Sequence, residues 1–309
     1  MLIDLILLVL GFVLLIKGAD YFVAGASSMA TRMCIPPIVI GLTVVAMGTS
    51  APEAAVSISS AMHGSNAIAI GNVLGSNIAN VFLILGLSAM ITPLIVQKNT
   101  IRFEIPFVGL ITVFLCWMGM TFGMISRAGA GFLLGLFVLF LGYLFIVSRG
   151  TKCDIDCDKA MGTVKIAAYI LLGLLALVLG SNITVSAACS IARFIGVSER
   201  VIGLTIVAIG TSLPELVTSV IAARKGQSDI AIGNIVGSNI FNILFVLGIA
   251  GIILPIPFAK EFIFDGIVAT MATILLLVFT LPSKRLSRFP GVLFVLIYMV
   301  YLVYLICGK

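Results

Sequence analysis

Long runs of apolar residues, separated by short polar breaks, fill almost the whole chain. A membrane-spanning helix needs about 20 mostly apolar residues, and the runs reach this length. We expect ten spans, at residues 3–24, 36–58, 67–95, 103–123, 129–148, 164–190, 201–222, 230–256, 262–281 and 290–307. The first run leads into Lys17 and Asp20 without a small-residue cleavage site, so we interpret it as a retained helix rather than a removed signal peptide. The pattern predicts an all-α membrane protein.

Two polar motifs each occur twice inside these apolar segments. The first reads Gly41-Leu-Thr-Val-Val-Ala-Met-Gly-Thr-Ser-Ala-Pro-Glu53 and, again, Gly203-Leu-Thr-Ile-Val-Ala-Ile-Gly-Thr-Ser-Leu-Pro-Glu215. The second reads Gly71-Asn-Val-Leu-Gly-Ser-Asn-Ile-Ala-Asn80 and Gly233-Asn-Ile-Val-Gly-Ser-Asn-Ile-Phe-Asn242. Both motifs recur after 162 positions. Helix packing alone would favour repeated Leu and Gly, so repeated Thr, Ser, Asn and Glu indicate a polar function in each half.

The positions of the motifs predict the domain organisation. They fall on the second and third predicted spans and again on the seventh and eighth, so each half holds five spans. An odd number of spans inverts the second half, as in many secondary transporters, whose substrate site lies near mid-membrane between the halves. We predict two inverted five-helix repeats, 1–148 and 164–309, joined by a cytoplasmic linker at 149–163.

The motifs are rich in oxygen ligands. The proline of each first motif clashes with the carbonyl four residues earlier, so backbone carbonyls near Ala46 and Ala208 should leave the helix ladder. In a membrane, a freed carbonyl is costly unless it lines a cavity or meets an ion. Side-chain oxygens of the first motif come from Thr49, Ser50, Glu53, Thr211, Ser212 and Glu215. The second motif places three polar residues along one helix face at i, i+4 and i+8. These are Asn72, Ser76 and Asn80, repeated as Asn234, Ser238 and Asn242.

The two glutamates indicate which ligand these oxygens bind. A charge at the bilayer centre costs about 2.5–3.5 kcal/mol on insertion scales, and neither motif contains a Lys or Arg to offset it. The neutralising charge must come from solvent, as a cation or a proton. An all-oxygen set suits hard cations, and a flexible set favours Ca²⁺ over Mg²⁺. When Ca²⁺ leaves, Na⁺ or H⁺ must replace it, and this exchange is the physical basis of antiport.

With both motifs present twice, the sequence resembles the cation/calcium exchanger superfamily, and most closely its prokaryotic sodium/calcium antiporters. The resemblance covers nearly the whole chain and implies exchange of Ca²⁺ for Na⁺ by alternating access. It also implies long, tilted first and sixth spans that slide against the other helices. The implied cluster of four cation sites would be lined by Ala46, Thr49, Ser50, Glu53, Ser76, Asn80, Ala208, Thr211, Ser212, Glu215, Ser238 and Asn242. Some relatives carry Asp at the position of Asn242, so this site is less acidic than theirs.

The charge distribution predicts the orientation in the membrane. Basic residues are few on the side of the two termini and more numerous on the other side, around 98–102, 149–165, 224–225 and 284–288. The positive-inside rule makes the second side cytoplasmic, so we expect a multi-pass cell-membrane protein with both termini outside. Cysteines in or beside spans, Cys34 among them, should pack as small apolar groups. Cys153 and Cys157 lie in the acidic linker, which we interpret as solvated rather than metal-binding.

Other protein classes fit this sequence less well. An enzyme would need a nucleophile with a base or a metal triad, and the single histidine, His63, lies in a predicted loop. Channels also use acidic rings, but inverted repeats with paired buried acids favour alternating access. A proton- or potassium-linked Ca²⁺ exchanger remains open as the alternative. We expect no cofactor, no nucleic acid and no obligate protein partner, only the lipid bilayer and the transported Ca²⁺ and Na⁺.

Overall fold

The computed structural model describes residues 2–64, 67–149, 161–197, 202, 206 and 208–307. Most of the predicted linker, with Cys153 and Cys157, lies outside this part, as do residues 203–205 and 207 of the repeated first motif. Arg200 and Lys309 lie outside it as well. The regular secondary structure of the described part is helical except for four short strands. The strands are β1 (Leu94–Ile95), β2 (Met124–Ile125), β3 (Ile256–Pro257) and β4 (Arg285–Leu286).

The helical elements follow one another in the same order in both halves. In the first half they are α1 (Leu2–Met33), α2 (Pro37–Ile40), η1 (Gly41–Val45), α3 (Ala46–Thr49), α4 (Ala51–Met62), α5 (Ala67–Ala79), η2 (Asn80–Leu85), α6 (Gly86–Ile91), η3 (Thr100–Glu104), α7 (Ile105–Phe122) and α8 (Arg127–Arg149). In the second half they are α9 (Thr163–Phe194), α11 (Ala208–Thr211), α12 (Leu213–Arg224), α13 (Ser228–Phe241), η6 (Asn242–Val246), α14 (Leu247–Ile253), α15 (Glu261–Thr280) and α16 (Arg288–Cys307). Elements labelled η are π-helical turns.

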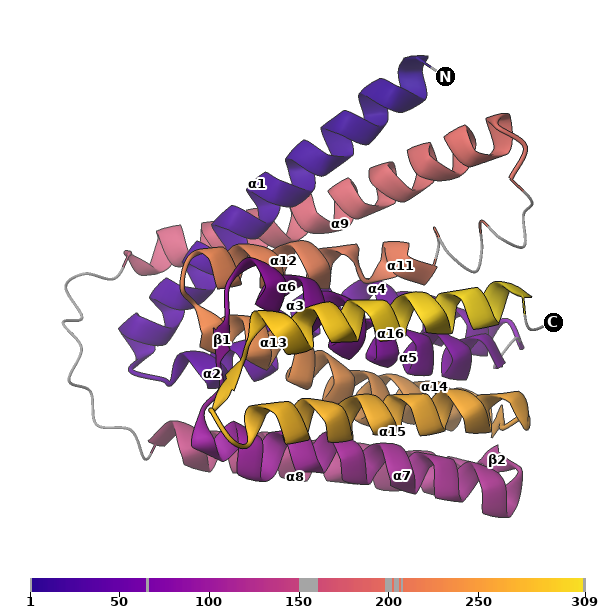
Figure 1. The fold of residues 1–309 in the computed structure, drawn as a ribbon. Coiled ribbons are helices and arrows are strands. Elements are labelled where there is room, and N and C mark those ends of the chain that lie inside the picture. The colour runs from indigo at the N-terminus through magenta and orange to yellow at the C-terminus, as the bar shows by residue number, and fades with distance from the viewer. Residues whose placement is uncertain are drawn as a thin grey trace.

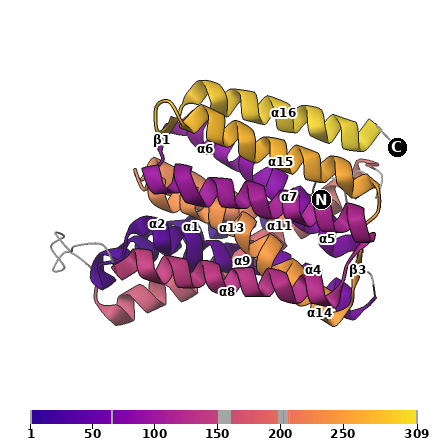
Figure 2. The same cartoon turned by 90° about the horizontal axis from the view of Figure 1, so that it is seen from below.

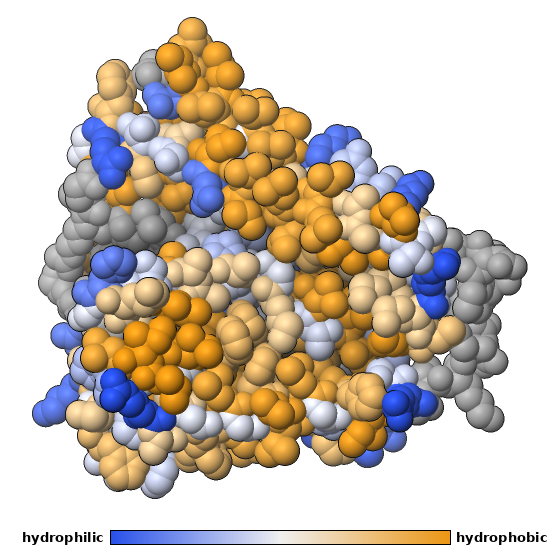
Figure 3. All heavy atoms as spheres, turned by 180° about the vertical axis from the view of Figure 1, so that it is seen from behind, coloured by the Kyte–Doolittle hydropathy of each residue, from blue (hydrophilic) through white to orange (hydrophobic). Residues whose placement is uncertain are grey.

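Eight helical stretches of the described chain are long and apolar enough to cross a membrane. The segments 37–49 and 51–62, bent by 50° at Ser50, make a ninth candidate if they count as one span. The predicted seventh span, over 201–222, lies partly outside the described residues. Figure 3 shows one face of the molecule, where apolar side chains cover the middle and charged ones lie towards the rims. The chain is an all-helical membrane protein, which confirms the predicted fold class.

The two longest helices, α1 and α9, cross each other as a tilted pair outside the remaining helices (Figure 1). They run antiparallel, because Gly11 packs against Gly180 while Gly18 packs against Gly173. A Cβ on Gly18 would lie 2.9 Å from the carbonyl oxygen of Gly173. Small residues let membrane helices approach this closely, so glycines at intervals of seven form the contact line.

The remaining helices form a bundle in which equivalent helices of the two halves make equivalent contacts. In the layer seen in Figure 2, α15 packs on α7, while α16 packs on α6 and α8 packs on α14. Strand β1 pairs with β4 and β2 pairs with β3, both antiparallel. These two ribbons lie at opposite ends of the bundle (Figure 1), so a strand of each half closes each end.

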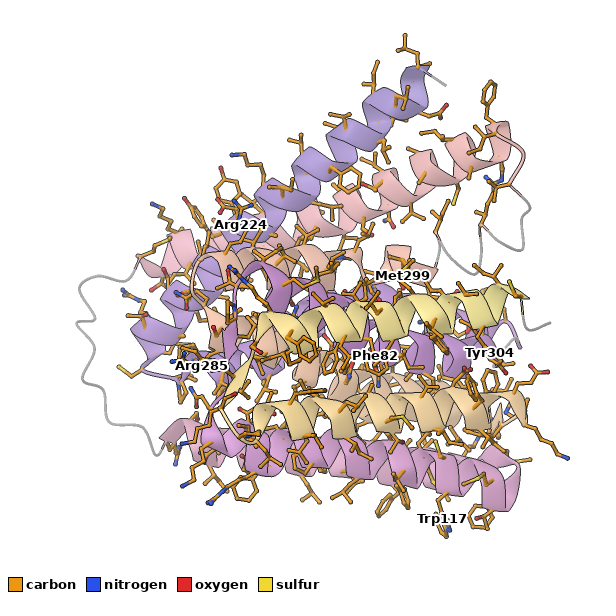
Figure 4. All side chains as sticks on the ribbon, viewed as in Figure 1. Phe82, Trp117, Arg224, Arg285, Met299 and Tyr304 are labelled. Atoms are coloured by element: carbon orange, nitrogen blue, oxygen red, sulfur yellow. The ribbon has the colours of Figure 1, made fainter. Side chains whose placement is uncertain are left out.

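Basic residues mark one end of the molecule. Arg224 and Arg285 lie at the left-hand end in Figure 4, while Trp117 and Tyr304 lie towards the right-hand end, where α1 begins and α16 ends. One ion pair and one corrected expectation lie near the basic end. The Asp20 carboxylate of α1 forms an ion pair with Lys225, which follows α12. Cys34 is disulfide-bonded, so it is not simply an apolar packing residue.

Candidate functional site

Each copy of the first motif breaks its helix at the serine. Ser50 separates α3 from α4 with φ −83° and ψ 8°, and Ser212 separates α11 from α12 with φ −89° and ψ 7°. We expected the prolines to lie in mid-helix. The structure instead places Pro52 and Pro214 in the first turn of a new helix, where a missing N–H costs little. The glutamates therefore also lie in a first turn, where the positive end of the helix dipole favours a carboxylate.

The two glutamates are buried at the centre and are held by the opposite half. Glu53 and Glu215 are each only 1% exposed. Ser50 Oγ donates to Glu215 Oε1 at 2.8 Å, and Ser212 Oγ donates to Glu53 Oε1 at 3.1 Å. Each break thus supplies the hydroxyl that orients the other carboxylate, and the two breaks meet as one site.

Several buried oxygens of this site lack a hydrogen-bond partner among the described residues. They are Glu53 Oε2, Glu215 Oε2, Asn80 Oδ1 and Asn242 Oδ1. Two carboxylate and two amide oxygens left without donors inside a membrane protein are costly. A hard cation satisfies such atoms directly, because carboxylate and amide oxygens are its preferred ligands. The arrangement is chemically suited to a positive ion.

The other residues of the first motif surround these oxygens. Thr49 is fully buried, and its Oγ1 donates to Asn234 Oδ1 at 3.0 Å and to the carbonyl of Ala46 at 3.4 Å. Ser238 Oγ reaches the same Ala46 carbonyl from α13, at 3.5 Å. This carbonyl also accepts the backbone N–H of Ser50 at 3.0 Å, so it does not leave the helix ladder as expected. The halves can approach because Gly233 and Gly237 of α13 pack backbone to backbone against Gly41 and Leu42.

The remaining predicted ligands occupy matching places. Ser76 is buried on α5, Ala208 begins α11, and Thr211 lies just before the second break. The side-chain amides of Asn72 and Asn234 hold neighbouring helices together by hydrogen bonds. Asn72 Nδ2 donates to Ser57 Oγ at 3.0 Å and to the carbonyl of Glu53 at 3.3 Å. Asn234 makes the equivalent bonds to Ser219 and Glu215.

Two residues of the site were not predicted from the sequence. Asn77 and Asn239, both buried, exchange hydrogen bonds with the asparagines that carry the orphaned amide oxygens. Asn239 Oδ1 accepts from Asn80 Nδ2 at 2.9 Å, and Asn77 Oδ1 accepts from Asn242 Nδ2 at 3.2 Å. These bonds hold the amides of Asn80 and Asn242 by their nitrogens, and each Oδ1 has no hydrogen-bond partner among the described residues. The signal was present, because both residues lie inside the repeated second motif.

A cavity lies beside the two broken helices on one side of the site. This cavity of about 830 Å³ is lined by Pro52 of α4, Thr211 of α11 and a polar row on α9. That row consists of Ser181, Asn182, Ser186, Ser190 and Arg193. At its inner end, Ser181 Oγ donates to the carbonyl of Gly210 at 2.8 Å. The cavity connects the broken helices to the end of α9 that carries Arg193, the end predicted to be outside.

Comparison with known proteins gives one consistent result. The family described as "Sodium/calcium exchanger protein" matches residues 3–146 and 165–307. CaxA of Alkalimonas amylolytica is 42% identical over 301 residues, which is 94% of each chain. The sodium/calcium exchanger MaX1 of Methanosarcina acetivorans is 32% identical over 95% of this chain and 96% of its own. The solved structure of the sodium-calcium exchanger NCX_Mj, soaked with Na⁺ and Sr²⁺, superposes with a TM-score of 0.86 at 32% identity over 97% of both chains.

Proposed function

The chain belongs to the sodium/calcium exchanger protein family, and we propose that it exchanges Ca²⁺ for Na⁺ across the cell membrane by alternating access. The family consists of membrane antiporters rather than enzymes. The proposal adds the identity of the two ions and the residues that bind them. It is supported by NCX_Mj, whose structure was determined with Na⁺ and Sr²⁺, an ion chemically close to Ca²⁺.

The observation that carries this proposal is a set of four oxygens, on two glutamates and two asparagines, that have no hydrogen-bond partner among the described residues. Two carboxylates balance one Ca²⁺, and the neutral oxygens around them complete its coordination. The proposed ligands are Ala46, Thr49, Ser50, Glu53, Ser76, Asn80, Ala208, Thr211, Ser212, Glu215, Ser238 and Asn242. Na⁺ must use the same two carboxylates, because no other acid lies in the motifs. Both ions therefore compete for one site.

Alternating access follows from the cost of the empty site. Without a cation, two carboxylates lie buried at one site, and burying unpaired charge is unfavourable. Loading with Ca²⁺ or Na⁺ neutralises the pair and permits the transition, whereas the empty site resists it. The cavity on the Arg193 side would then be the outward route to the site, and the inverted half would supply the inward route.

Flux measurement tests the ion pair directly. Purified protein in liposomes should take up ⁴⁵Ca²⁺ when an outward Na⁺ gradient is imposed, and K⁺ or pH gradients alone should not drive it. Uptake driven by a pH or K⁺ gradient without Na⁺ would favour the proton- or potassium-linked exchanger instead. In equilibrium binding, NaCl should displace ⁴⁵Ca²⁺ where choline chloride does not.

Orientation remains part of the proposal. The basic end of the bundle, with Arg224 and Arg285 (Figure 4), should face the cytoplasm. A reporter fused after Lys309 should be active only if its enzyme functions outside the cytoplasm. Activity of a cytoplasm-only reporter at that position would overturn the topology.

A further inference from the structure

A groove on the outer surface of α7 and α8 belongs to neither ion motif. It has a volume of about 440 Å³ and is lined by residues of η3, α7 and α8. Phe107 stacks on Phe140 across its floor, with ring centroids 5.6 Å apart. Leu110 and Leu139 line it with exposed apolar surface. On a membrane protein such a surface faces lipid, so the body of the groove suits an acyl chain.

One end of this apolar groove contains a buried carboxylate. Glu104 is only 4% exposed, and its Oε1 accepts a hydrogen bond from the Tyr143 hydroxyl at 2.6 Å. Its Oε2 has no hydrogen-bond partner in the described part of the chain. Both residues line the groove. A carboxylate oxygen without a donor is costly in these surroundings, so a cationic group from outside the protein would stabilise it.

A positive charge lines the same groove without satisfying that oxygen. Arg102 is exposed, lies two residues before Glu104, and forms no ion pair with it among the described residues. The groove thus presents a guanidinium and a carboxylate separately, above an aromatic floor. A guanidinium binds phosphate well, while the carboxylate suits an ammonium with N–H donors.

We propose that this groove binds a phospholipid with a primary-amine headgroup, of the phosphatidylethanolamine class. The lipid phosphate contacts Arg102, its ammonium donates to Glu104 Oε2, and an acyl chain lies on Phe107 and Phe140. Arg102 and Glu104 lie in η3, which follows β1, and β1 pairs with β4 at the basic end of the bundle (left in Figure 1). The lipid therefore comes from the leaflet on that side. The site is independent of the ion-exchange proposal, because none of its residues lies in the motifs.

The choice among headgroups follows from hydrogen-bond donors and charge. Phosphatidylcholine has the same net charge, but its quaternary ammonium has no N–H to donate. Phosphatidylglycerol keeps the phosphate and lacks the ammonium. Of these three lipids, only phosphatidylethanolamine offers both a phosphate to Arg102 and a charged N–H donor to Glu104.

Native mass spectrometry of the detergent-purified protein, titrated with each of the three lipids, tests the assignment. We expect phosphatidylethanolamine to bind more tightly than phosphatidylcholine of the same acyl chains. Glu104→Gln should weaken phosphatidylethanolamine binding roughly tenfold or more, the loss expected for a charged hydrogen bond, and leave phosphatidylglycerol binding unchanged. Arg102→Gln should weaken binding of both lipids.

Two further variants distinguish lipid binding in the groove from lipid binding elsewhere on the protein. Leu139→Trp fills the groove without changing either charge, and it should reduce binding of all three lipids. Asp265→Asn is the matched control, because Asp265 accepts a hydrogen bond from Tyr301 at 2.9 Å in the second half. It should keep the preference for phosphatidylethanolamine. Equal binding of phosphatidylethanolamine and phosphatidylcholine, or the same loss in Asp265→Asn as in Glu104→Gln, would overturn the proposal.

Discussion

Replacing one site carboxylate by the amide of the same shape tests the ion site most directly. In Glu215→Gln, the amide oxygen can keep the place of Oε1 and accept the 2.8 Å hydrogen bond from Ser50 Oγ. The amide nitrogen then occupies the place of Oε2, which has no partner among the described residues. The substitution removes one negative charge and leaves the packing in place, so a change in ion binding reports the charge itself.

The size of the effect follows from the burial of the site. Removing one partner from a buried charge pair costs about 3–5 kcal/mol. Since each ~1.4 kcal/mol is a factor of ten in affinity, Ca²⁺ binding should weaken by roughly two to nearly four orders of magnitude. Stability should change in the opposite direction when no ion is present. The ion-free variant should unfold at a higher temperature than the ion-free wild type, because an unpaired buried charge has been removed.

Two measurements on detergent-purified protein decide this prediction. Equilibrium ⁴⁵Ca²⁺ binding gives the affinity, and thermal unfolding with and without Ca²⁺ shows whether the ion still stabilises the fold. Glu53→Gln should behave in the same way, because Ser212 holds Glu53 as Ser50 holds Glu215. The control Asp265→Asn, outside the motifs, should bind Ca²⁺ normally. Wild-type Ca²⁺ affinity in either glutamine variant would refute the proposed role of that carboxylate.

Three other predictions follow from the same geometry. Lowering the pH should weaken Ca²⁺ binding, because protons compete for the two site carboxylates. Titration calorimetry in buffers of different ionisation enthalpy should record proton release when Ca²⁺ binds. Binding without proton release would contradict this competition. Gly18→Ala should slow exchange but spare Ca²⁺ binding, because its Cβ would lie 2.9 Å from the Gly173 carbonyl oxygen, an overpacking worth about 1–3 kcal/mol. Gly135→Ala, whose Cβ meets no described atom within 4 Å, is the matched control for flux. Asn77→Ala should weaken Ca²⁺ binding by about 1–3 kcal/mol, since the Asn242 amide loses its acceptor; unchanged binding would make Asn77 a packing residue.

The sequence predicts most of this architecture because its polar motifs are rare in apolar segments and occur twice. The fold class, the repeated breaks and the meeting of the two glutamates all follow from that pattern. What it does not predict is pairing between residues far apart in the chain. The bond from Ser50 to Glu215 joins residues 165 positions apart, and the ion pair of Asp20 with Lys225 depends on how α1 lies against the bundle.

The exact position of the helix break is a second feature that the sequence does not predict. A proline within a long apolar run indicates an interrupted helix, yet it does not say on which side the interruption falls. In the structure the turn lies at Ser50, two residues before Pro52, and places Glu53 in the first turn of α4. The backbone of a helix start, rather than a loose mid-helix kink, therefore presents the carboxylate.

The two halves agree at the centre of the molecule and differ at its periphery. Every residue of the proposed ion site has a partner of the same type 162 positions away, as expected for inverted repeats that meet at a shared site. The groove residues do not, because the positions that match Arg102, Glu104 and Tyr143 hold Phe264, Gly266 and Leu305. The proposed ion site is shared by both faces, whereas the groove lies on one side, and the two leaflets present different surroundings. A lipid-binding groove on one side alone is therefore compatible with a symmetric ion site, and its loss should alter lipid preference without changing which ions are exchanged.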